Sequence, residues 1–563
     1  MALPFYDCNC MIGTRQWRHF VQPQTLGDFQ RDFDYYDIMG ALVYHAAAVE
    51  YSPDYGNRRL LKEIGDDPRL LPQWVVLPHQ AGEMARGEEL VEEMMALGVR
   101  AARMYPKSHG FGVSEEVCGE LLRALEARRV PLFIDHAELD LPAAGELARR
   151  HPELPVVLCG VYWHYDRVIF GMLGGGDELA NGSRSGERSY HGSKTGIANL
   201  YFDTWAYQNH RGYEAFVERL GSERLLFCTN LPHRSPGAAR MMTCYENLSE
   251  QDRENIAGRN LLRLLGGVRG AQGREVPAWR EPPAHPEDDP IVAAVRAGQP
   301  LRKEFVLDSH NHLGHPGCKG IDLCAIPAND GDGLIGTMDR LGVDIACPSS
   351  WAGITYAGQD ANDHTLGAAA KHPGRILPWG CLNPSYPQVF EAEFERLFVG
   401  GKVIGYKPAP FRQVVPLTDP VHFPVYEWCS KRRAPVLCGD GPMRLAEVTE
   451  LAPKYPEVPF LNAHTGSSYE FAKNTIETAR KYSNVFAEIT YTLIWYGMIE
   501  YLVEELGPER VLYGSDCVMR DLAPQVGWVA WARIPLEAKR RVLGLNMADI
   551  LGLPEERRRS LSG

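Results

Sequence analysis

The chain carries at residues 305–314 the sequence Phe305-Val306-Leu307-Asp308-Ser309-His310-Asn311-His312-Leu313-Gly314. An apolar run followed by polar residues and a glycine predicts a buried strand that ends in a loop. Side chains alternate along a strand, so His310 and His312 are expected to point to the same side. Two imidazoles placed in this way suit a divalent metal. On its own, such a pair is more often two hydrogen-bonded loop histidines. Other residues must therefore show whether a metal site is present.

The composition is that of a globular protein with more than one domain. The 563 residues predict two or three domains, and the 45% hydrophobic content supplies ample core. A net charge of −13 argues against a nucleic-acid or membrane partner and leaves a small-molecule substrate. The thirteen cysteines are odd in number and lack paired CxxC spacing, which indicates reduced thiols and a cytoplasmic protein. The N-terminus resembles no signal peptide, and no stretch is long and apolar enough to span a bilayer.

The start of the chain repeats the pattern of residues 305–314. In the segment from Phe5 to Gly13, Asp7 matches Asp308 and Gly13 matches Gly314. Internal similarity of this kind indicates a repeated unit, so further matches are expected along the chain. Further matches keep the same order in both halves: Tyr105-Pro106-Lys107 with Tyr406-Lys407-Pro408, residues 128–133 with 432–437, 151–155 with 455–459, and 220–227 with 506–513.

Short apolar strands alternate with helical segments in both halves, a pattern that predicts repeated βα units and a parallel sheet. About 250 residues of such alternation is typical of a (β/α)8 barrel. The expected fold class is therefore α/β, with two tandem (β/α)8 barrels at residues 1–268 and 304–563. Residues 269–303 between them are rich in proline and predict a linker.

Functional side chains of such barrels project from the C-terminal ends of the strands. In the second half, His310 and His312 follow the first strand, His464 follows a later strand, and Asp516 follows the last one. Each has an ordinary explanation alone, as a satisfied polar residue or a helix cap. Together, four groups from three strand ends predict a metal site.

These motifs, Asp-x-His-x-His-x-Gly, His464 before Thr465-Gly466, and Gly514-Ser515-Asp516, resemble the amidohydrolase superfamily. The branch they resemble includes aminocarboxymuconate-semialdehyde decarboxylase and resorcylate decarboxylase. The resemblance covers residues 305–550 and, more weakly, 5–265. It implies that His310 and His312 bind metal, that Asp516 is a ligand or proton acceptor, and that His464 is a catalytic acid/base or second ligand.

One departure from the family concerns the end of the fifth strand, where the family usually carries a metal-binding histidine. Here Pro435-Val436-Leu437-Cys438 is followed by Gly439 and Asp440. Asp440 could replace the histidine as an oxygen ligand, and so could Glu488 at the end of the next strand but one. Lys407 lies where some superfamily members have a carboxylated lysine that bridges two metals, although a structural or substrate-binding lysine is the simpler interpretation. The cofactor expected is zinc, manganese or iron, mononuclear or dinuclear, and added carboxylates favour manganese or iron.

The first half has lost the corresponding groups. Asn9, Met11, Gly160 and Asn230 stand in the places of His310, His312, His464 and Asp516. The first barrel is therefore interpreted as a degenerate copy without a metal site, and one site per chain is predicted.

A metal at the mouth of the second barrel predicts a hydrolase or decarboxylase that acts on a small carboxylated or amide-type substrate through a metal-activated water. Asp516 would accept a proton, and His464 would stabilise charge or protonate a leaving group. A homo-oligomer is expected. Two other interpretations stay open, a dinuclear iron or iron–manganese oxygenase and a non-catalytic binding protein. Candidate pocket residues are Trp351, Tyr356, Trp495 and Tyr496, with Arg412 and Arg520 for a substrate carboxylate.

Overall fold

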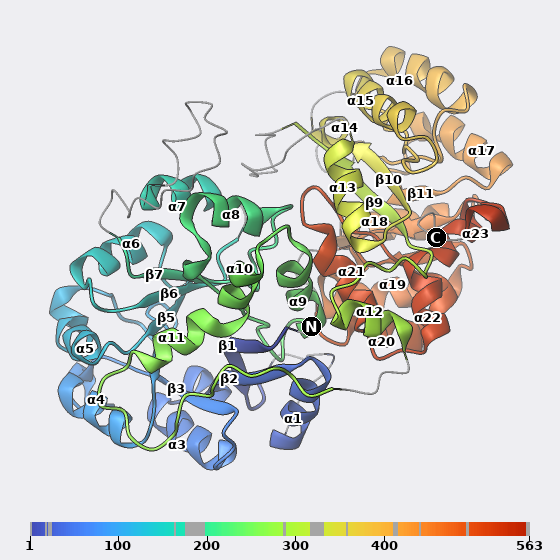
Figure 1. Cartoon of the computed structure of the whole chain (residues 1–563). Helices are drawn as coiled ribbons and strands as arrows, with labels where there is room; N and C mark the ends of the chain where they lie inside the picture. The colour runs from blue at the N-terminus through green and yellow to red at the C-terminus, as the bar shows by residue number, and fades with distance from the viewer. Residues whose placement is uncertain are drawn as a thin grey trace, which may run out of the picture. The chain divides into compact units, whose positions relative to one another are not determined.

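The computed structural model describes residues 3–16, 20, 25–162, 165–174, 197–284, 289–315, 331–355, 358–408, 415–438, 441–490 and 495–558. The chain divides into two compact units (Figure 1). Unit 1 comprises residues 1–208, 212–239 and 246–285, and unit 2 comprises residues 209–211, 240–245 and 286–563. Asp440, Tyr356 and Arg412, named above as candidates, lie outside the described residues.

Unit 1 contains eight parallel strands that pair in the order of the sequence. Hydrogen bonds from Cys8 N to Phe227 O (3.0 Å) and from Met11 N to Leu231 O (2.8 Å) join the first strand to the end of the last. The strands are β1 (Phe5–Ile12), β2 (Ile38–His45), β3 (Leu70–Val75), β4 (Ala101–Met104), β5 (Leu132–Asp135), β6 (Val156–Cys159), β7 (Leu200–Asp203) and β8 (Leu225–Leu226). The predicted α/β class and parallel barrel are confirmed for the first half of the chain.

Helices of unit 1 lie around the outside of these strands (Figure 1). In α3, for example, Ser52 caps the first turn, Pro53 occupies the first helical position, and Gly65 ends the helix at φ 50°. Leu60 and Ile64, one turn apart, bury the inner face. The helices are α1 (Leu26–Tyr35), α2 (Ala46–Glu50), α3 (Pro53–Ile64), α4 (Gly87–Ala96), α5 (Glu115–Arg128), α6 (Leu141–Arg150), α7 (Asp166–Leu173), α8 (Gly212–Leu220), α10 (Glu250–Glu254) and α11 (Asn260–Gly266). Helix α9 (Pro236–Tyr245) has residues 236–239 in unit 1 and residues 240–245 in unit 2.

Unit 2 has a two-stranded and a four-stranded parallel sheet among its described residues. Isolated bridges from Ala346 to Ile376, from Gly380 to Tyr406 and from Tyr406 to Val436 run between the two sheets. Ser309 N donates to Tyr513 O at 3.2 Å, which joins the first strand to the end of the last. The strands are β9 (Leu307–Leu313), β10 (Ile345–Ser350), β11 (Val436–Cys438), β12 (Phe460–Asn462), β13 (Val485–Glu488) and β14 (Val511–Leu512).

The helices of unit 2 follow or precede these strands along the chain, so that α and β segments alternate. They are α12 (Pro290–Arg296), α13 (Asp332–Leu341), α14 (Trp351–Thr355), α15 (Gly358–Lys371), α16 (Pro387–Phe394), α17 (Phe423–Arg432), α18 (Gly441–Leu451), α19 (Tyr469–Lys481), α20 (Met498–Leu506), α21 (Leu522–Ala530), α22 (Leu536–Arg540) and α23 (Asn546–Ile550). Among the helices described in the chain, none is both long and apolar enough to cross a membrane.

Asparagine side chains form the same hydrogen bonds to the backbone at equivalent positions of the two units; we call these asparagines braces. Asn199 Nδ2 donates to the carbonyl oxygens of residues 148, 151 and 154, and Asn484 Nδ2 donates to those of residues 452, 455 and 458. Asn57 exchanges two hydrogen bonds with the backbone of Val75, and Asn362 does so with Cys381. Both units therefore satisfy buried carbonyl groups at helix-to-strand connections in the same way.

Candidate metal centre

His310 and His312 lie on β9, and both residues are 2% exposed. Their ring centroids are 5.2 Å apart, as the alternation along the strand predicts for two residues on one side. The carboxylate of Asp308 accepts hydrogen bonds from His310 N (3.2 Å) and from Ser515 N (2.9 Å) and Oγ. This carboxylate thus joins the start of the motif to the loop that follows β14.

Asp516 lies in that loop, and its backbone N donates to His310 O at 2.8 Å. Its Oδ1 is 3.1 Å from Nε2 of His312 and 3.8 Å from Nε2 of His310. Ligand atoms of these three buried residues lie within 4.8 Å of one another, close enough to share one ion. The structure thus brings together three of the residues predicted from the sequence.

His464 lies two residues after the end of β12, and its ring centroid is 5.3 Å from that of His310. It is less buried than the two histidines of β9. His464 and Asp516 both adopt left-handed backbone conformations, with φ of 60° and 61°. Such conformations are costly for residues with a side chain and cluster at functional sites.

The Nδ1 atom of each of the three rings lies at hydrogen-bond distance from a group of the scaffold. When Nδ1 donates a hydrogen bond, the lone pair of Nε2 can bind a metal ion or a proton. This is the usual arrangement of histidine ligands. The partners are Glu488 Oε2 for His310 (3.2 Å), Ser349 Oγ for His312 (3.2 Å) and Thr490 O for His464 (2.9 Å).

Lys407 and Glu488 lie on opposite sides of the His310 ring. Lys407 Nζ contacts Nε2 of His310, on the side of the cluster, whereas Glu488 contacts Nδ1. Glu488 also accepts hydrogen bonds from Thr490 N (3.0 Å) and Oγ1. Glu488 is therefore placed behind His310 as an orienting group, while Lys407 is beside the atoms that would meet a metal.

The electrostatic state of the cluster suits a metal. Burial and the charge of Lys407 lower the pKa of His310 well below its usual value and that of His312 to about 4, so both rings are neutral. Burial raises the pKa of Glu488 to about 8. Burial would also raise the pKa of Asp516, but the hydrogen bond with His312 and the neighbouring charges keep it below its usual value. Neutral imidazoles and an ionised carboxylate are what a divalent ion requires.

The other aromatic and arginine candidates are less directly connected to the cluster. The ring of Trp351 meets that of His312 edge-on at 5.2 Å. Trp495 Nε1 donates to Ser467 O at 3.1 Å, and Tyr496 OH accepts from Arg533 at 3.1 Å. Arg520 is buried and donates to its neighbour's carbonyl oxygen at 2.6 Å. Trp351 is thus the candidate pocket residue with a ring contact to a cluster histidine.

The corresponding positions of unit 1 carry different side chains with different contacts. Met11 packs in an apolar cluster with Tyr44, Val75 and Tyr105. Asn9 Nδ2 donates to Asp203 Oδ2 at 3.3 Å, in the place of the His310–Glu488 contact. In place of the two imidazoles, unit 1 therefore has an apolar cluster around Met11 and a polar contact at Asn9.

One match made from the sequence is wrong. The sequence match pairs Tyr105-Pro106 with Tyr406-Lys407. In the structure Ala102 pairs with Leu132 as Tyr406 pairs with Val436, so Arg103 is the counterpart of Lys407. The short Tyr-Pro-Lys similarity displaced the alignment by three residues, because it lay beyond the end of the strand.

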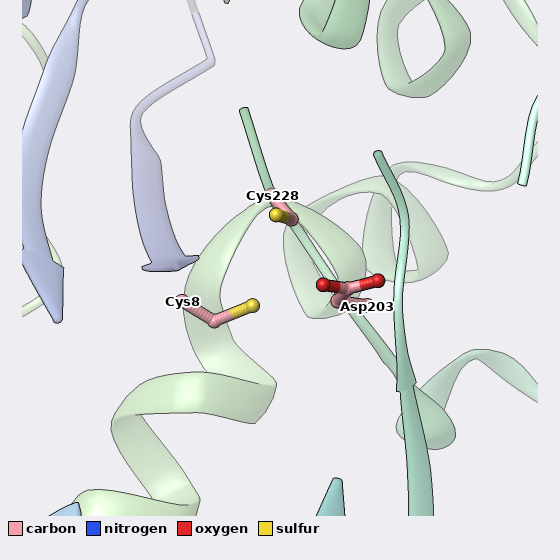
Figure 2. A group of neighbouring side chains, drawn as sticks. All are labelled: Cys8, Asp203 and Cys228. Carbon is pink, nitrogen blue, oxygen red and sulfur yellow. The ribbon is translucent and has the colours of Figure 1, made fainter. Parts of the chain in front are cut away.

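Sequence reasoning also missed two sets of residues. Ser349 contacts His312 across the β9–β10 pair, and only the register of that pair places it there. In unit 1, Cys8, Asp203 and Cys228 gather with ligand atoms within 4.8 Å of one another (Figure 2). They come from β1, from β7 and from the segment after β8. Cys8 and Cys228 occupy the places of Ser309 and Gly514, which are not among the predicted ligand positions.

Comparison with known proteins finds a family model described as Amidohydrolase, which matches residues 21–267 and 348–553. No curated protein matches the chain. Solved structures match at 14–17% identity over 44–45% of this chain and 97–99% of theirs, with TM-scores of 0.36–0.37. They include 5-carboxyvanillate decarboxylase from Sphingomonas paucimobilis, 2,6-dihydroxybenzoate decarboxylase from Rhizobium, and 5-carboxyvanillate decarboxylase from Novosphingobium aromaticivorans complexed with manganese.

Proposed function

Because the chain belongs to the amidohydrolase family, we propose that unit 2 is a metal-dependent hydrolase or decarboxylase that acts on a small carboxylated or amide-type substrate. The observation that carries the proposal is the convergence of His310, His312 and Asp516, with ligand atoms within 4.8 Å. The donor set of two imidazoles and one carboxylate suits manganese, iron or zinc.

In this proposal a bound divalent ion would lower the pKa of a water molecule and polarise a carbonyl or carboxylate group of the substrate. Asp516 accepts a proton, since its carboxylate is kept ionised beside His312. His464 is the least buried of the three histidines, and Thr490 O fixes its Nδ1, so Nε2 can exchange a proton with the substrate. Lys407 supplies a positive charge that could hold a substrate carboxylate.

We also propose that unit 2 is a second (β/α)8 barrel, derived with unit 1 from one ancestral copy. A (β/α)8 barrel would need two more strands between β10 and β11. The isolated bridges at Ile376, Gly380 and Tyr406 supply strand-like contacts in that interval. The matched asparagine braces and the matched Asp7 and Asp308 contacts support a common origin.

A dinuclear iron or iron–manganese oxygenase is the second candidate. The contact between Lys407 Nζ and His310 Nε2 favours it, because a carboxylated lysine at this place could bridge two ions. The engagement of Glu488 with Thr490 and Nδ1 of His310 favours the hydrolase or decarboxylase, because it removes a carboxylate from the set available to a second ion.

The test uses the full-length protein, purified anaerobically and loaded separately with manganese, iron or zinc. Each protein is incubated with a panel of small carboxylates and amides. The release of carbon dioxide, the release of amine and the uptake of oxygen are measured. Metal-dependent release of carbon dioxide or amine without oxygen uptake is expected. Oxygen uptake in step with turnover would instead establish the oxygenase.

Variants connect the activity to the site. His312→Ala should lose one metal equivalent per chain, and Asp516→Asn should lower kcat by about 100-fold or more. The matched control is His372→Ala, since His372 pairs with Asp332 at the end of a helix. Metal content that is unchanged in His312→Ala would disprove the assignment of the site.

A further inference from the structure

We propose that Cys8, Asp203 and Cys228 of unit 1 form a second metal site that binds a thiophilic divalent ion such as zinc. This site uses positions different from those of the family's histidine ligands. Figure 2 shows the three side chains gathered together, with the sulfur of Cys8 directed toward the carboxylate of Asp203. All three ligand atoms lie within 4.8 Å of one another.

The ligand atoms of Cys8, Asp203 and Cys228 lie close enough to occupy three corners of a tetrahedral site. With zinc–sulfur bonds of about 2.3 Å and zinc–oxygen bonds of about 2.0 Å, ligand atoms lie about 3.5–4 Å apart. The three residues are each 0% exposed and come from β1, β7 and the segment after β8. Little movement would therefore be needed to enclose an ion.

Asn9 offers a fourth donor. Its side chain is 3% exposed and contacts Asp203 through Nδ2, while its Oδ1 has no hydrogen-bond partner among the described residues. Rotation of the amide exchanges the two atoms and turns the oxygen toward the carboxylate side. A metal would satisfy this buried acceptor, which otherwise costs free energy.

The charge balance also permits an ion. The guanidinium of Arg103 is buried on β4 and acts electrostatically on both Cys8 and Asp203. When one divalent ion binds, two thiol protons leave for solvent, so the net charge of the cluster does not change. Two thiolates, one carboxylate and the ion together carry one negative charge, beside which lie the positive charge of Arg103 and the buried carboxyl group of Asp7.

Cobalt spectroscopy on the full-length protein tests the proposal. The protein is produced in cobalt-supplemented medium under reducing conditions, so that a buried site fills during folding. The predicted ligands of unit 2 include no sulfur, so a sulfur-to-cobalt charge-transfer band reports unit 1 alone. One equivalent of cobalt with this band is expected, and it should persist in the double variant His310→Ala, His312→Ala.

Substitutions assign the band to the cluster. Cys8→Ser together with Cys228→Ser should abolish it, and Asp203→Asn should shift it. Cys10→Ser is the matched control, because this buried thiol of the same strand contacts Thr229 and lies outside the cluster. Absence of the band from the reduced wild-type protein would overturn the proposal, and this result does not depend on whether the double cysteine variant folds. Cys8 and Cys228 would then be neutral thiols that only pack in the core. A band that survives in a folded double variant would overturn it as well.

Discussion

Single groups behind the histidines hold each ring of the cluster in unit 2. Glu488, Ser349 and the carbonyl group of Thr490 each contact one Nδ1 atom. Such contacts fix the orientation of the ring, so they affect a metal without touching it.

The Ser349→Ala substitution removes one of these contacts and leaves the proposed ligands intact. We expect metal affinity at unit 2 to fall by about 10–100-fold, because His312 loses its orienting partner. Competition with a chelator of known affinity measures the change. Ser309→Ala is the control, since Ser309 Oγ donates to the carbonyl oxygen of Tyr513. Equal affinities in the two variants would refute the role of Ser349.

Substitution of His464 separates backbone strain from chemistry. His464 adopts φ 60°, and its counterpart Gly160 adopts φ 69°, which glycine tolerates without cost. His464→Gly and His464→Ala should both lose activity, but the glycine variant should be more stable by about 1 kcal/mol. Chemical denaturation of the two variants provides the comparison. An alanine variant as stable as the glycine variant would argue against strain at this position.

At the scale of the element, Tyr406 and His422 join a strand segment beside Lys407 to the turn before α17. Tyr406 OH and His422 Nδ1 are 2.8 Å apart, and His422 is 1% exposed. Burial lowers the pKa of His422 to about 4, with Asp419 and Arg444 as its charged neighbours. The neutral ring is thus part of the folded state.

Stability should therefore decrease in acid. A histidine with a lowered pKa contributes its stability above the unfolded pKa of about 6.5 and loses it as the pH falls toward about 4. Between about pH 7 and about pH 5 the loss from His422 should be about 2 kcal/mol. His422→Gln keeps a hydrogen-bonding side chain and should remove that part of the pH dependence. Identical pH profiles of denaturation for the two proteins would contradict the prediction.

The sequence predicts elements better than contacts between them. Apolar runs and their following breakers located β9, β12 and β14, and with them His310, His312, His464 and Asp516. The family predicted from these motifs is confirmed. Ser349, Arg103 and the cysteine cluster were missed because strand register and barrel closure bring them together, and neither has a local signal.

At the scale of the whole molecule, two units carry equivalent braces in different surroundings. Asn199→Ala would leave three carbonyl groups of unit 1 without their donor, and Asn484→Ala would do the same in unit 2. Each should destabilise its own unit by about 2–4 kcal/mol.

Calorimetry of the full-length protein measures this effect. Two unfolding transitions are expected, because chains with several domains depart from two-state behaviour. Each variant should lower one transition and leave the other unchanged. A single transition that both variants lower equally would show that the units unfold together.

The pair formed by Glu488 and Gly514 has a consequence for how the two copies diverged. A Cβ atom at residue 514 would collide with the carboxylate of Glu488, whereas unit 1 carries the shorter Asp203 opposite Cys228. If the two halves descend from one gene, the mutational path between these states is ordered. The intermediate has an aspartate at the first position and a glycine at the second, since a glutamate and a cysteine do not fit together. If the ancestor resembled unit 2, glutamate was replaced by aspartate before glycine was replaced by cysteine. If the ancestor resembled unit 1, cysteine was replaced by glycine before aspartate was replaced by glutamate.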